Sequence, residues 1–485
     1  MKNRIPFTAQ INEGLTQFWG YTRLSLMAAC VATSVPSVAQ NAQIIYKNQC
    51  AGCHGGQMQG SAGPALIKKE WKHGGDRASI LKTIRQGVPT TEMMKFEGIL
   101  SAREIEAVTD FIVNAQTAPQ LLKKADLPLS VQTKHYNLKI EKLVTEGLNS
   151  PWGLEFIDAT RALITGKNGD LYMLENGKLD PQKIIGLPKV YGTDLVGGLM
   201  DLALDPNYKT NGWIYLGFSH NPQNSTDKKT PGMTKIVRGK LRDHQWVDEQ
   251  TLFQVPDSLL VTGGTRWGCR FLFDKQGHLY FTIGDMNRAN DSQILTRPSG
   301  KVYRINPDGS IPKDNPLYGQ PNVLQAIYSW GNRNVQGLAQ HPATGVIYAT
   351  EHGPQGGDEL NILKKGANYG WPVITYGIDY NGSIVSTETQ RAGMEQPLTY
   401  WTPSIAVSAI EFVTGGQFPR WQNNLLVTAL KFEEIRRLVV AGDKVLEQEV
   451  LLKGYGRVRD LKIGPEGALY VLTNAPDALV RITKE

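Results

Sequence analysis

Apolar and polar residues alternate along most of the chain, and one pattern of alternation recurs. An apolar strand, a turn and a second strand appear in this order six times after residue 141. Alternation with a period of two, closed by turns, predicts antiparallel hairpins. Six units at intervals of roughly 50 to 70 residues favour a propeller of six four-stranded blades over 141–485, with a pair of β-sandwiches as the competing architecture. The units are Trp152–Phe156 with Leu163–Thr165, Leu202–Pro206 with Ile214–Leu216, Phe271–Asp274 with Leu279–Thr282, Leu338–Pro342 with Ile347–Thr350, Ala409–Phe412 with Leu425–Thr428, and Leu461–Pro465 with Leu469–Thr473.

The preceding part of the chain has a helical pattern instead. Residues 42–48 are amphipathic, and residues 101–114 are predicted to form a helix because Ser101 and Glu104 have the spacing of a capping box. Between the two parts, residues 118–140 turn polar and predict a linker followed by a first strand. The pattern therefore predicts a mainly β protein, a six-bladed β-propeller preceded by a small all-α domain at 40–117.

The chain begins with the pattern of an export signal. Lys2, Arg4 and Arg23 precede the apolar run Leu24–Val35, which small residues follow up to Ala39. This order predicts a signal peptide at 1–39, cleavage after Ala39 and a periplasmic protein. An uncleaved anchor is one alternative, because the basic stretch is long. A lipoprotein modified at Cys30 is another.

Composition and charge narrow the class further. A chain of 485 residues with 41% hydrophobic residues, 20% charged residues and 50 glycines is globular, turn-rich and large enough for several domains. Without residues 1–39 the formal charge falls from +7 to about +5. This charge is spread over the chain without clusters of Lys and Arg, so we expect no nucleic-acid partner. It would suit docking to an acidic redox partner.

The cysteines mark the all-α domain as a haem domain. The sequence Cys50-Ala51-Gly52-Cys53-His54 has the spacing of c-type haem attachment. Two residues between the thiols place both sulfurs at the two vinyl groups, and His54 then supplies an imidazole to the iron. A pair of surface cysteines or a redox dithiol is the alternative.

Further residues agree with the haem assignment and predict the second axial ligand. Pro64 follows in a turn whose carbonyl can hold the other nitrogen of the ligating imidazole. The region resembles the small cytochrome c family over about 40–117. The resemblance implies that Met93 is the sixth ligand, with Met94 one position off, whereas Met58 is expected to be core filler. A histidine and methionine pair raises the reduction potential, which suits an electron acceptor.

Four motifs in the propeller resemble the soluble glucose and aldose sugar dehydrogenases that use PQQ and calcium. These motifs are Trp330–Gly337, Thr350–Glu359, Asn368–Pro372 and Arg457–Asp460, and the resemblance runs from about 140 to the C-terminus. It implies that PQQ binds to Arg333, Asn334, Lys431, Arg457 and Arg459; guanidinium and ammonium groups suit its three carboxylates. It also implies a catalytic calcium at the carbonyls of Gly353 and Pro354, and a second calcium site that includes Glu359 and Tyr369. Without the resemblance, a buried ion-pair network would explain the cations.

The resemblance breaks at the position of the catalytic base. The family uses a histidine where this chain has Arg266. Arginine has a pKa of at least ~12.5, so its deprotonation near neutral pH costs ~7.5 kcal/mol. General-base catalysis contributes a factor of ~10² to 10⁴, or roughly 3 to 5 kcal/mol. Arginine is therefore a poor base.

Other residues near this break bear on the chemistry. Asp285 stands where the family has a carboxylate that orients the base, so it either accepts a proton itself or pairs with Arg266 if the two are close. We take Arg266 and Asp285 as the candidate catalytic residues. Val196 replaces a glutamine that contacts the cofactor in the family. His352, or less favourably His220, is an alternative base, and Cys269 is expected to be a buried core thiol.

The sequence supports two functions of different classes. In the first, an exported quinohaemoprotein oxidises a sugar or another alcohol at PQQ and passes electrons to its covalent haem c, and then to an acceptor such as another cytochrome. Arg266 further suggests an anionic substrate. In the second, a degenerate propeller binds a ligand without catalysis and the cytochrome serves elsewhere.

Overall fold

A computed structural model describes residues 42–43, 45–56, 58, 60, 63–67, 70–88, 93–118, 128–193, 196–223, 225, 227 and 230–485. The export signal predicted at 1–39, with its cleavage site, lies outside these residues. Within them, no helix combines the length and the hydrophobicity that a membrane crossing needs.

The N-terminal domain is helical, as the sequence predicts. Its elements are the π-helix η1 (Tyr46–Cys50), α2 (Ala51–His54), α3 (Arg77–Gln86) and α4 (Ala102–Thr117). The predicted capping box begins α4: the Glu104 backbone N–H donates to Ser101 Oγ, and the Ser101 N–H donates to Glu104 Oε2. Apolar faces of α3 and α4 then pack with Tyr46, Cys50 and Met58 into one core. Met58 is fully buried there, as expected of core filler.

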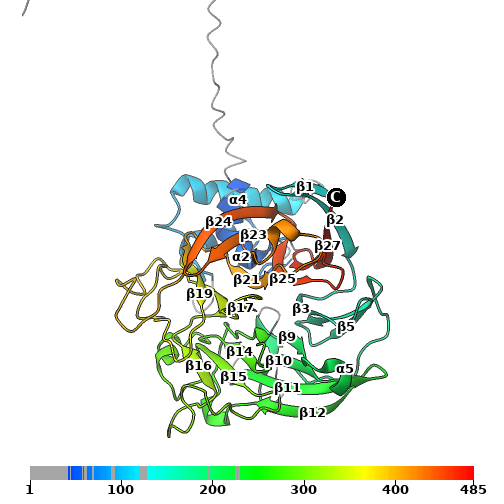
Figure 1. Cartoon of the computed structure of the whole chain (residues 1–485). Helices are drawn as coiled ribbons and strands as arrows, with labels where there is room; N and C mark the ends of the chain where they lie inside the picture. Colours follow the sequence, from blue (N-terminus) through cyan, green and yellow to red (C-terminus); the bar gives the residue numbers. More distant parts are fainter. Residues whose placement is uncertain are drawn as a thin grey trace, which may run out of the picture. The chain divides into compact units, whose positions relative to one another are not determined.

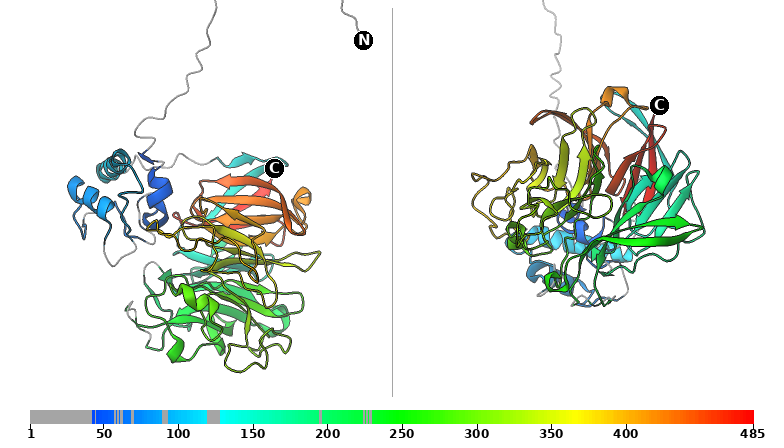
Figure 2. Two further views of the ribbon diagram at one scale, coloured as in Figure 1. Left: turned by 90° about the vertical axis from the view of Figure 1, so that its left-hand side faces the viewer. Right: turned by 60° about the horizontal axis from the view of Figure 1, so that its bottom comes forward.

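Six antiparallel sheets follow, arranged as blades around a central axis (Figures 1 and 2). The six hairpins predicted from the sequence are confirmed, because each forms the first two strands of one blade. The first blade consists of β3 (Pro151–Phe156), β4 (Arg161–Gly166), β5 (Leu171–Glu175) and β6 (Lys178–Leu179), and the second of β9 (Leu199–Leu204), β10 (Ile214–His220), β11 (Met233–Arg242) and β12 (Gln245–Phe253). The third consists of β13 (Phe271–Phe273), β14 (Leu279–Ile283), β15 (Lys301–Ile305) and β16 (Ile327–Trp330), and the fourth of β17 (Val335–Gln340), β18 (Ile347–Glu351), β19 (Asp358–Ile362) and β20 (Thr399–Trp401). The fifth consists of β21 (Val407–Phe412), β22 (Leu425–Ala429), β23 (Glu434–Ala441) and β24 (Lys444–Lys453).

The last blade closes the ring and has five strands where the sequence predicts four. Its strands β25 (Arg457–Ile463), β26 (Leu469–Asn474) and β27 (Ala478–Lys484) are continued by β2 (Asn137–Val144) and β1 (Ser130–Gln132) from the other end of the propeller. Pairing of β2 with β27 leaves no open edge between the first and last blades. The smaller elements are β7 (Gly192–Thr193) with β8 (Val196–Gly197), α5 (Tyr208–Asn211), η3 (Asp257–Leu259), η4 (Ala289–Gln293) and η5 (Pro419–Trp421).

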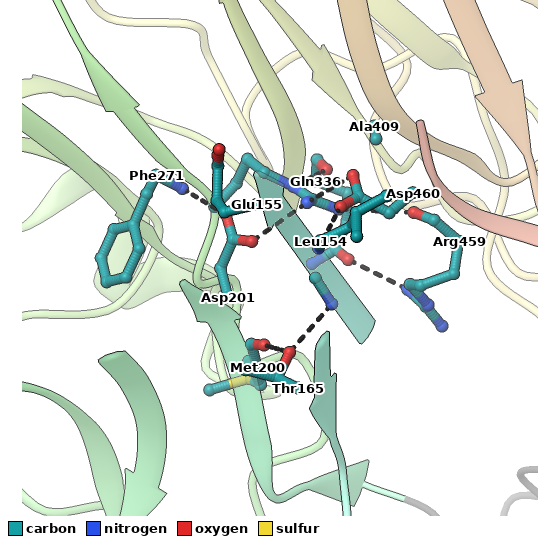
Figure 3. A network of polar contacts seen from close by, with 12 residues as sticks. Leu154, Glu155, Thr165, Met200, Asp201, Phe271, Gln336, Ala409, Arg459 and Asp460 are labelled. Carbon is teal, nitrogen blue, oxygen red and sulfur yellow. Dashed lines mark hydrogen bonds and ion pairs between the residues drawn. The ribbon is translucent and has the colours of Figure 1, made fainter. Parts of the chain in front are cut away.

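Buried charges at the axis tie the blades together. The Arg270 guanidinium lies 3.0 Å from Asp460, 3.3 Å from Asp201 and over the ring of Trp152, and its Nε donates to the Gln336 carbonyl at 2.8 Å. These partners come from the first strands of four blades, β25, β9, β3 and β17. Figure 3 shows Asp460, Asp201 and Gln336 close together. Both carboxylates also accept backbone N–H groups of neighbouring blades. One arginine thus joins five of the six blades.

Replacing Arg270 with methionine should destabilise the propeller by about 3 to 5 kcal/mol, because two buried carboxylates would lose their cation. Denaturant unfolding monitored by tryptophan fluorescence measures this loss. Arg481→Met is a matched control at the surface, where the arginine pairs with Glu141 and Glu466. It should cost less than about 1 kcal/mol. Equal effects of the two changes would contradict a central role for Arg270.

Candidate functional site

The haem motif lies where the first helices meet the core of the N-terminal domain. Cys50 ends η1 and is buried, and His54 ends α2 and is buried. His54 Nδ1 lies 2.8 Å from the Pro64 carbonyl, so Nδ1 carries the proton and donates it. This bond leaves Nε2 as the nitrogen that can ligate iron, as the motif predicts.

The remaining haem residues surround the same core. Met93 and Met94 are both partly buried against it. Cys53 belongs to α2, but its side chain lies outside the described part of the structure. An apolar shell, a buried thiol and an oriented imidazole are three of the features that a covalent haem requires, so the described residues fit this cofactor. The choice of Met93 over Met94 stays a prediction.

The candidate residues of the propeller converge at one end because of its strand order. The first two strands of each blade are antiparallel, so the beginning of the first and the end of the second lie at the same end of the propeller. Eight of the candidate positions follow this rule. Those that precede or begin a first strand are Arg266, Arg333, Asn334 and Arg457, and those that follow a second strand are Asp285, Gly353, Pro354 and Lys431.

Arg266 and Asp285 form an ion pair. Arg266 Nε lies 2.6 Å from Asp285 Oδ1, and Arg266 Nη2 lies 3.2 Å from Oδ2. The carboxylate also accepts the indole N–H of Trp371 at 2.9 Å and the backbone N–H of Asn287 at 3.1 Å. Asp285 is fully buried, whereas 22% of the Arg266 side chain is exposed. Four donors therefore occupy the oxygens of Asp285, and Arg266 keeps its outer N–H groups for a ligand.

Arg333 and Asn334 present hydrogen-bond donors to the same region. Arg333 Nη1 donates to the Gly353 carbonyl at 2.7 Å, whereas its buried Nε has no acceptor among the described residues. Asn334 Oδ1 accepts from the Gly268 N–H and from Gln336 Nε2, both at 3.2 Å, so its NH₂ group is left for a ligand. A buried guanidinium N–H without an acceptor is costly, and an anionic ligand would satisfy it.

Further cations make this end of the propeller electropositive. Burial and the charges of Arg457 and Arg270 lower the pKa of Arg459 to about 9. Burial and the charges of Arg459 and Arg457 lower the pKa of Lys167 to about 7. Lys167 was missed in the sequence. It follows the second strand of the first blade, so the hairpin repeat itself could have located it. Together with Lys431, these groups fit a ligand with several carboxylates.

A pocket beside Arg333 contains two carboxylates in direct cross-strand register. Glu351 of β18 pairs with Glu359 of β19, and both side chains line the pocket with Tyr369 and Trp371. Like charges directly opposite each other destabilise a sheet. Burial raises the pKa of Glu351 to about 7; burial and the charge of Glu351 raise that of Glu359 to about 8. A bound cation would offset both the repulsion between the two carboxylates and the free-energy cost of burying their charges.

Two amide oxygens next to this pocket also lack donors. Asn332 donates to Glu351 at 2.7 Å and Asn361 donates to Glu359 at 3.0 Å, while the Oδ1 atoms of both amides accept no hydrogen bond from a described residue. Carboxylate and amide oxygens are ligands that calcium prefers. The residues therefore fit a calcium ion, and they add Glu351 to the predicted Glu359 and Tyr369. Pairing of two glutamates across a hairpin was the signal that sequence reasoning overlooked.

Calcium should stabilise the protein through this pocket, by about 2.7 kcal/mol at a concentration 100 times the Kd. Glu359→Gln should remove most of the stabilisation, because it takes a charged ligand from the site. Melting temperatures with calcium and with a chelator measure it. Glu388→Gln is the matched control, since Glu388 pairs with Arg391 on the surface. A calcium effect that persists unchanged in Glu359→Gln would exclude this carboxylate as a ligand.

The two carbonyls predicted to bind the catalytic calcium already accept hydrogen bonds from the protein, unlike the amide oxygens beside the carboxylate pocket. The Gly353 carbonyl accepts from Arg333, and the Pro354 carbonyl accepts from Ser404 at 3.1 Å. Each carbonyl keeps one lone pair for a cation. His352 is held by the Val407 carbonyl, and burial and the charge of Arg333 lower its pKa to about 3. A base with this pKa is weak.

The remaining predicted positions are placed as follows. Cys269 is fully buried in the core beside the second and third blades, as expected of a structural thiol. His220 ends β10 and packs against Phe218. Val196 lies in β8, and its side chain is outside the described part of the structure.

Known proteins match both parts of the chain. The family model described as Glucose / Sorbosone dehydrogenase matches residues 148–481, and that described as Cytochrome C oxidase, cbb3-type, subunit III matches residues 37–112. Aldose sugar dehydrogenase YliI of Escherichia coli (strain K12) is 37% identical over 340 residues, which cover 69% of this chain and 89% of that protein.

Solved structures match the propeller. The soluble aldose sugar dehydrogenase from Escherichia coli in the apo-form has a TM-score of 0.66 at 35% identity and covers 72% of this chain and 100% of its own. The PQQ-bound form of aldose sugar dehydrogenase from Streptomyces coelicolor has a TM-score of 0.57 at 25% identity and covers 72% of this chain and 98% of its own.

Fold, site and similarity define a sugar oxidoreductase of the β-propeller class joined to a cytochrome. The chain belongs to the glucose/sorbosone dehydrogenase family and carries an N-terminal cytochrome c domain of the cbb3 type. The predicted fold class is thereby confirmed.

Proposed function

We propose that the protein oxidises a sugar, or a related alcohol, with PQQ bound at the propeller and passes the electrons to a covalent haem c. The observation that carries the proposal is the buried Arg333 Nε, which lacks an acceptor among the described residues. The charges of Arg333, Arg459 and Arg457 all act on His352, so these cations lie near one another. When bound, PQQ would take two electrons and one hydrogen, as a hydride, from a hemiacetal carbon, and the proton of its hydroxyl group would pass to solvent, which leaves a lactone. Arg333, Asn334, Lys431, Arg457 and Arg459 would hold its carboxylates.

Calcium would have two places in this arrangement. The carbonyls of Gly353 and Pro354 would face the bound cofactor, and Glu359, Tyr369 and Glu351 would hold the second ion. The pairing of Glu351 with Glu359 across β18 and β19 supports the second calcium site independently of the first. Neutralising these carboxylates would fix the 353–359 turn that carries the carbonyls and anchors Arg333.

Arg266 and Asp285 would position the substrate rather than accept its proton. Four hydrogen bonds occupy the oxygens of Asp285, and deprotonating an arginine costs more than general-base catalysis returns. The outer N–H groups of Arg266 would instead hold a substrate oxygen. This role predicts slow turnover of neutral aldoses and favours a substrate that brings an anionic group.

We propose that the protein acts in the periplasm and that its electrons pass through the haem domain to another cytochrome. Residues 1–39 would direct export to the periplasm and would be cleaved off after Ala39. Residues 40–117 would carry the haem, and residues 118–140 would link the domains and provide the first strand. Residues 141–485 would form the catalytic propeller. Cys50, Cys53, His54 and Met93 would bind haem c. A tether raises the effective concentration of haem near the propeller, so reoxidation need not await collision. Another cytochrome would accept the electrons next.

A non-catalytic binding module fused to the cytochrome is the second candidate. Two substitutions favour it: Arg266 stands in place of the expected histidine, and Val196 in place of the expected glutamine. The first removes the expected base and the second removes one contact to the cofactor, whereas the cation cluster that would serve binding is present.

Reconstitution separates the two functions. The purified full chain would be loaded with PQQ and calcium and mixed with aldoses, simple alcohols and uronic acids while the reduced-haem bands are recorded. Haem reduction that requires PQQ, calcium and a donor supports the oxidoreductase. Tight PQQ binding without haem reduction by any donor would leave the binding module instead.

A further inference from the structure

The loop between β14 and β15 begins next to Asp285 and contributes no other group to the proposed cofactor and calcium sites. It spans residues 284–300 and contains the short helix η4, which ends at Gln293. Its polar side chains bond to two motifs that do contribute groups, residues 330–337 and 368–372. The loop is therefore placed to set how these motifs lie relative to Asp285.

Gln293 forms a closed amide pair with Asn368. Gln293 Nε2 donates to Asn368 Oδ1 at 3.0 Å, and Asn368 Nδ2 donates back to Gln293 Oε1 at 2.7 Å. Gln293 Nε2 also donates to the Trp371 carbonyl at 2.8 Å. Asn368 Oδ1 accepts the Gly370 N–H at 2.9 Å. One glutamine thus holds both ends of the turn that carries Trp371.

The amide pair packs directly against the backbone from which Arg333 projects. A Cβ atom at Gly331 would lie 2.1 Å from Asn368 Oδ1 and 2.8 Å from Gln293 Nε2, so no side chain fits there. Gly331 also has a φ of 75°, in the region that favours glycine. Its carbonyl accepts the Trp371 N–H at 2.8 Å. The two motifs therefore meet at Gly331, with Gln293 against both.

A buried ammonium group fixes the helix that carries Gln293. Lys301 is fully buried at the start of β15. Its Nζ donates at 2.7 to 3.0 Å to three carbonyls of the loop, those of Asp291, Ser292 and Ser299. These bonds use all three donors of the ammonium group. The Ser292 carbonyl also accepts the Gly331 N–H at 3.0 Å. The helix is thus held from below by Lys301 and joined to Gly331 above.

The side chain at the other end of this network is Trp371. Its indole N–H donates to Asp285 at 2.9 Å, and its ring lies 5.4 Å from Arg333 Cζ. A shift of the Trp371 backbone would therefore move a donor of Asp285 and a neighbour of Arg333 together. Misplacements of about 1 Å caused away from the reacting atoms can cost about 10²-fold in rate.

We propose that Gln293 is a positioning residue, which holds Trp371 against Asp285 and Arg333. Lys301 fixes the helix from which Gln293 acts. This rests on the proposed function in one respect: the groups that Trp371 adjoins are those proposed to bind PQQ and to orient the substrate. In this role Gln293 touches neither cofactor nor substrate and acts through Trp371.

A double-variant cycle on PQQ affinity tests this role. Gln293→Leu should raise the Kd of the full chain for PQQ, with calcium present, by about 3- to 10-fold, the value of one hydrogen bond. Trp371→Phe removes the indole donor and should raise the Kd similarly. The double variant should bind no more weakly than the weaker single variant, because both changes remove the same support.

Two further variants complete the cycle. Asn368→Leu breaks the amide pair from its other side and should act as Gln293→Leu does. Gln250→Leu is the matched control, because Gln250 accepts two hydrogen bonds from Arg238 on an exposed surface. It should leave the Kd for PQQ unchanged.

Hydrogen exchange in the chain without PQQ separates this inference from the proposed function. The Gly370 and Trp371 amides should exchange about 3- to 10-fold faster in Gln293→Leu than in the native chain or in Gln250→Leu. If no sugar reduces the haem but the exchange and the PQQ cycle show these patterns, the oxidation fails and the positioning role stands. Unchanged exchange in Gln293→Leu, or effects on the Kd that multiply in the double variant, would overturn the positioning role.

Discussion

Replacing Arg266 with histidine should accelerate the oxidation of simple aldoses by about 10²- to 10⁴-fold, the usual contribution of a general base. Asp285 is already fixed by Trp371 at 2.9 Å and by the Asn287 backbone at 3.1 Å. It would accept the Nδ1–H of the new imidazole and leave Nε2 to take the substrate's proton. An imidazole accepts a proton only when it is neutral. The gain should therefore be present above a pKa near ~6.5 and lost as the pH falls through it.

Steady-state kcat/KM for glucose between pH 5 and 8, followed by haem reduction, measures this gain. Arg266→Gln is the control, because it removes the ion pair without supplying a base. A higher kcat/KM in Arg266→His but not in Arg266→Gln, with the stated pH dependence, supports the role of a general base at position 266. Equal gains in both variants would mean that the ion pair itself obstructs the substrate, and no gain in either would contradict the proposed role of position 266.

Replacing Cys50 and Cys53 together with serine should abolish covalent haem attachment and, with it, all sugar-dependent haem reduction. The two thioether bonds are the covalent link in this class of cytochrome, and His54 alone would hold the haem only by coordination. The propeller has its own separate sheets and cores, so the variant should still reduce a soluble dye with sugar as donor.

Haem staining after denaturing electrophoresis and dye reduction in solution measure these two outcomes. Cys269→Ala is the control, because Cys269 lies in the propeller core and should leave the haem in place. Haem that stays attached through denaturation in the double variant would refute attachment at this motif. Loss of dye reduction along with the haem would show that the propeller depends on the cytochrome domain.

Local sequence patterns determined much of the fold. The alternation at Trp152–Phe156 and its five repeats located the first hairpin of every blade, because pairing within a hairpin depends on neighbouring residues. The Ser101 and Glu104 capping box likewise located the start of α4. The two-residue spacing between Cys50 and Cys53, followed by His54, by itself defined a haem motif. In each case the interacting residues lie within about one hairpin or one helical turn of each other.

Only the tertiary structure decided what depends on residues distant in the chain. Pairing of β2 with β27 joins segments from opposite ends of the propeller, so the strand predicted before residue 141 belongs to the last blade, which no local pattern indicated. Arg270 meets its carboxylates at the axis, and Arg266 meets Asp285, because the blades bring separate strands together. Burial is a property of the whole fold, so the raised pKa of Glu351 and the unsatisfied Nε of Arg333 among the described residues arise only once the ring of blades has closed.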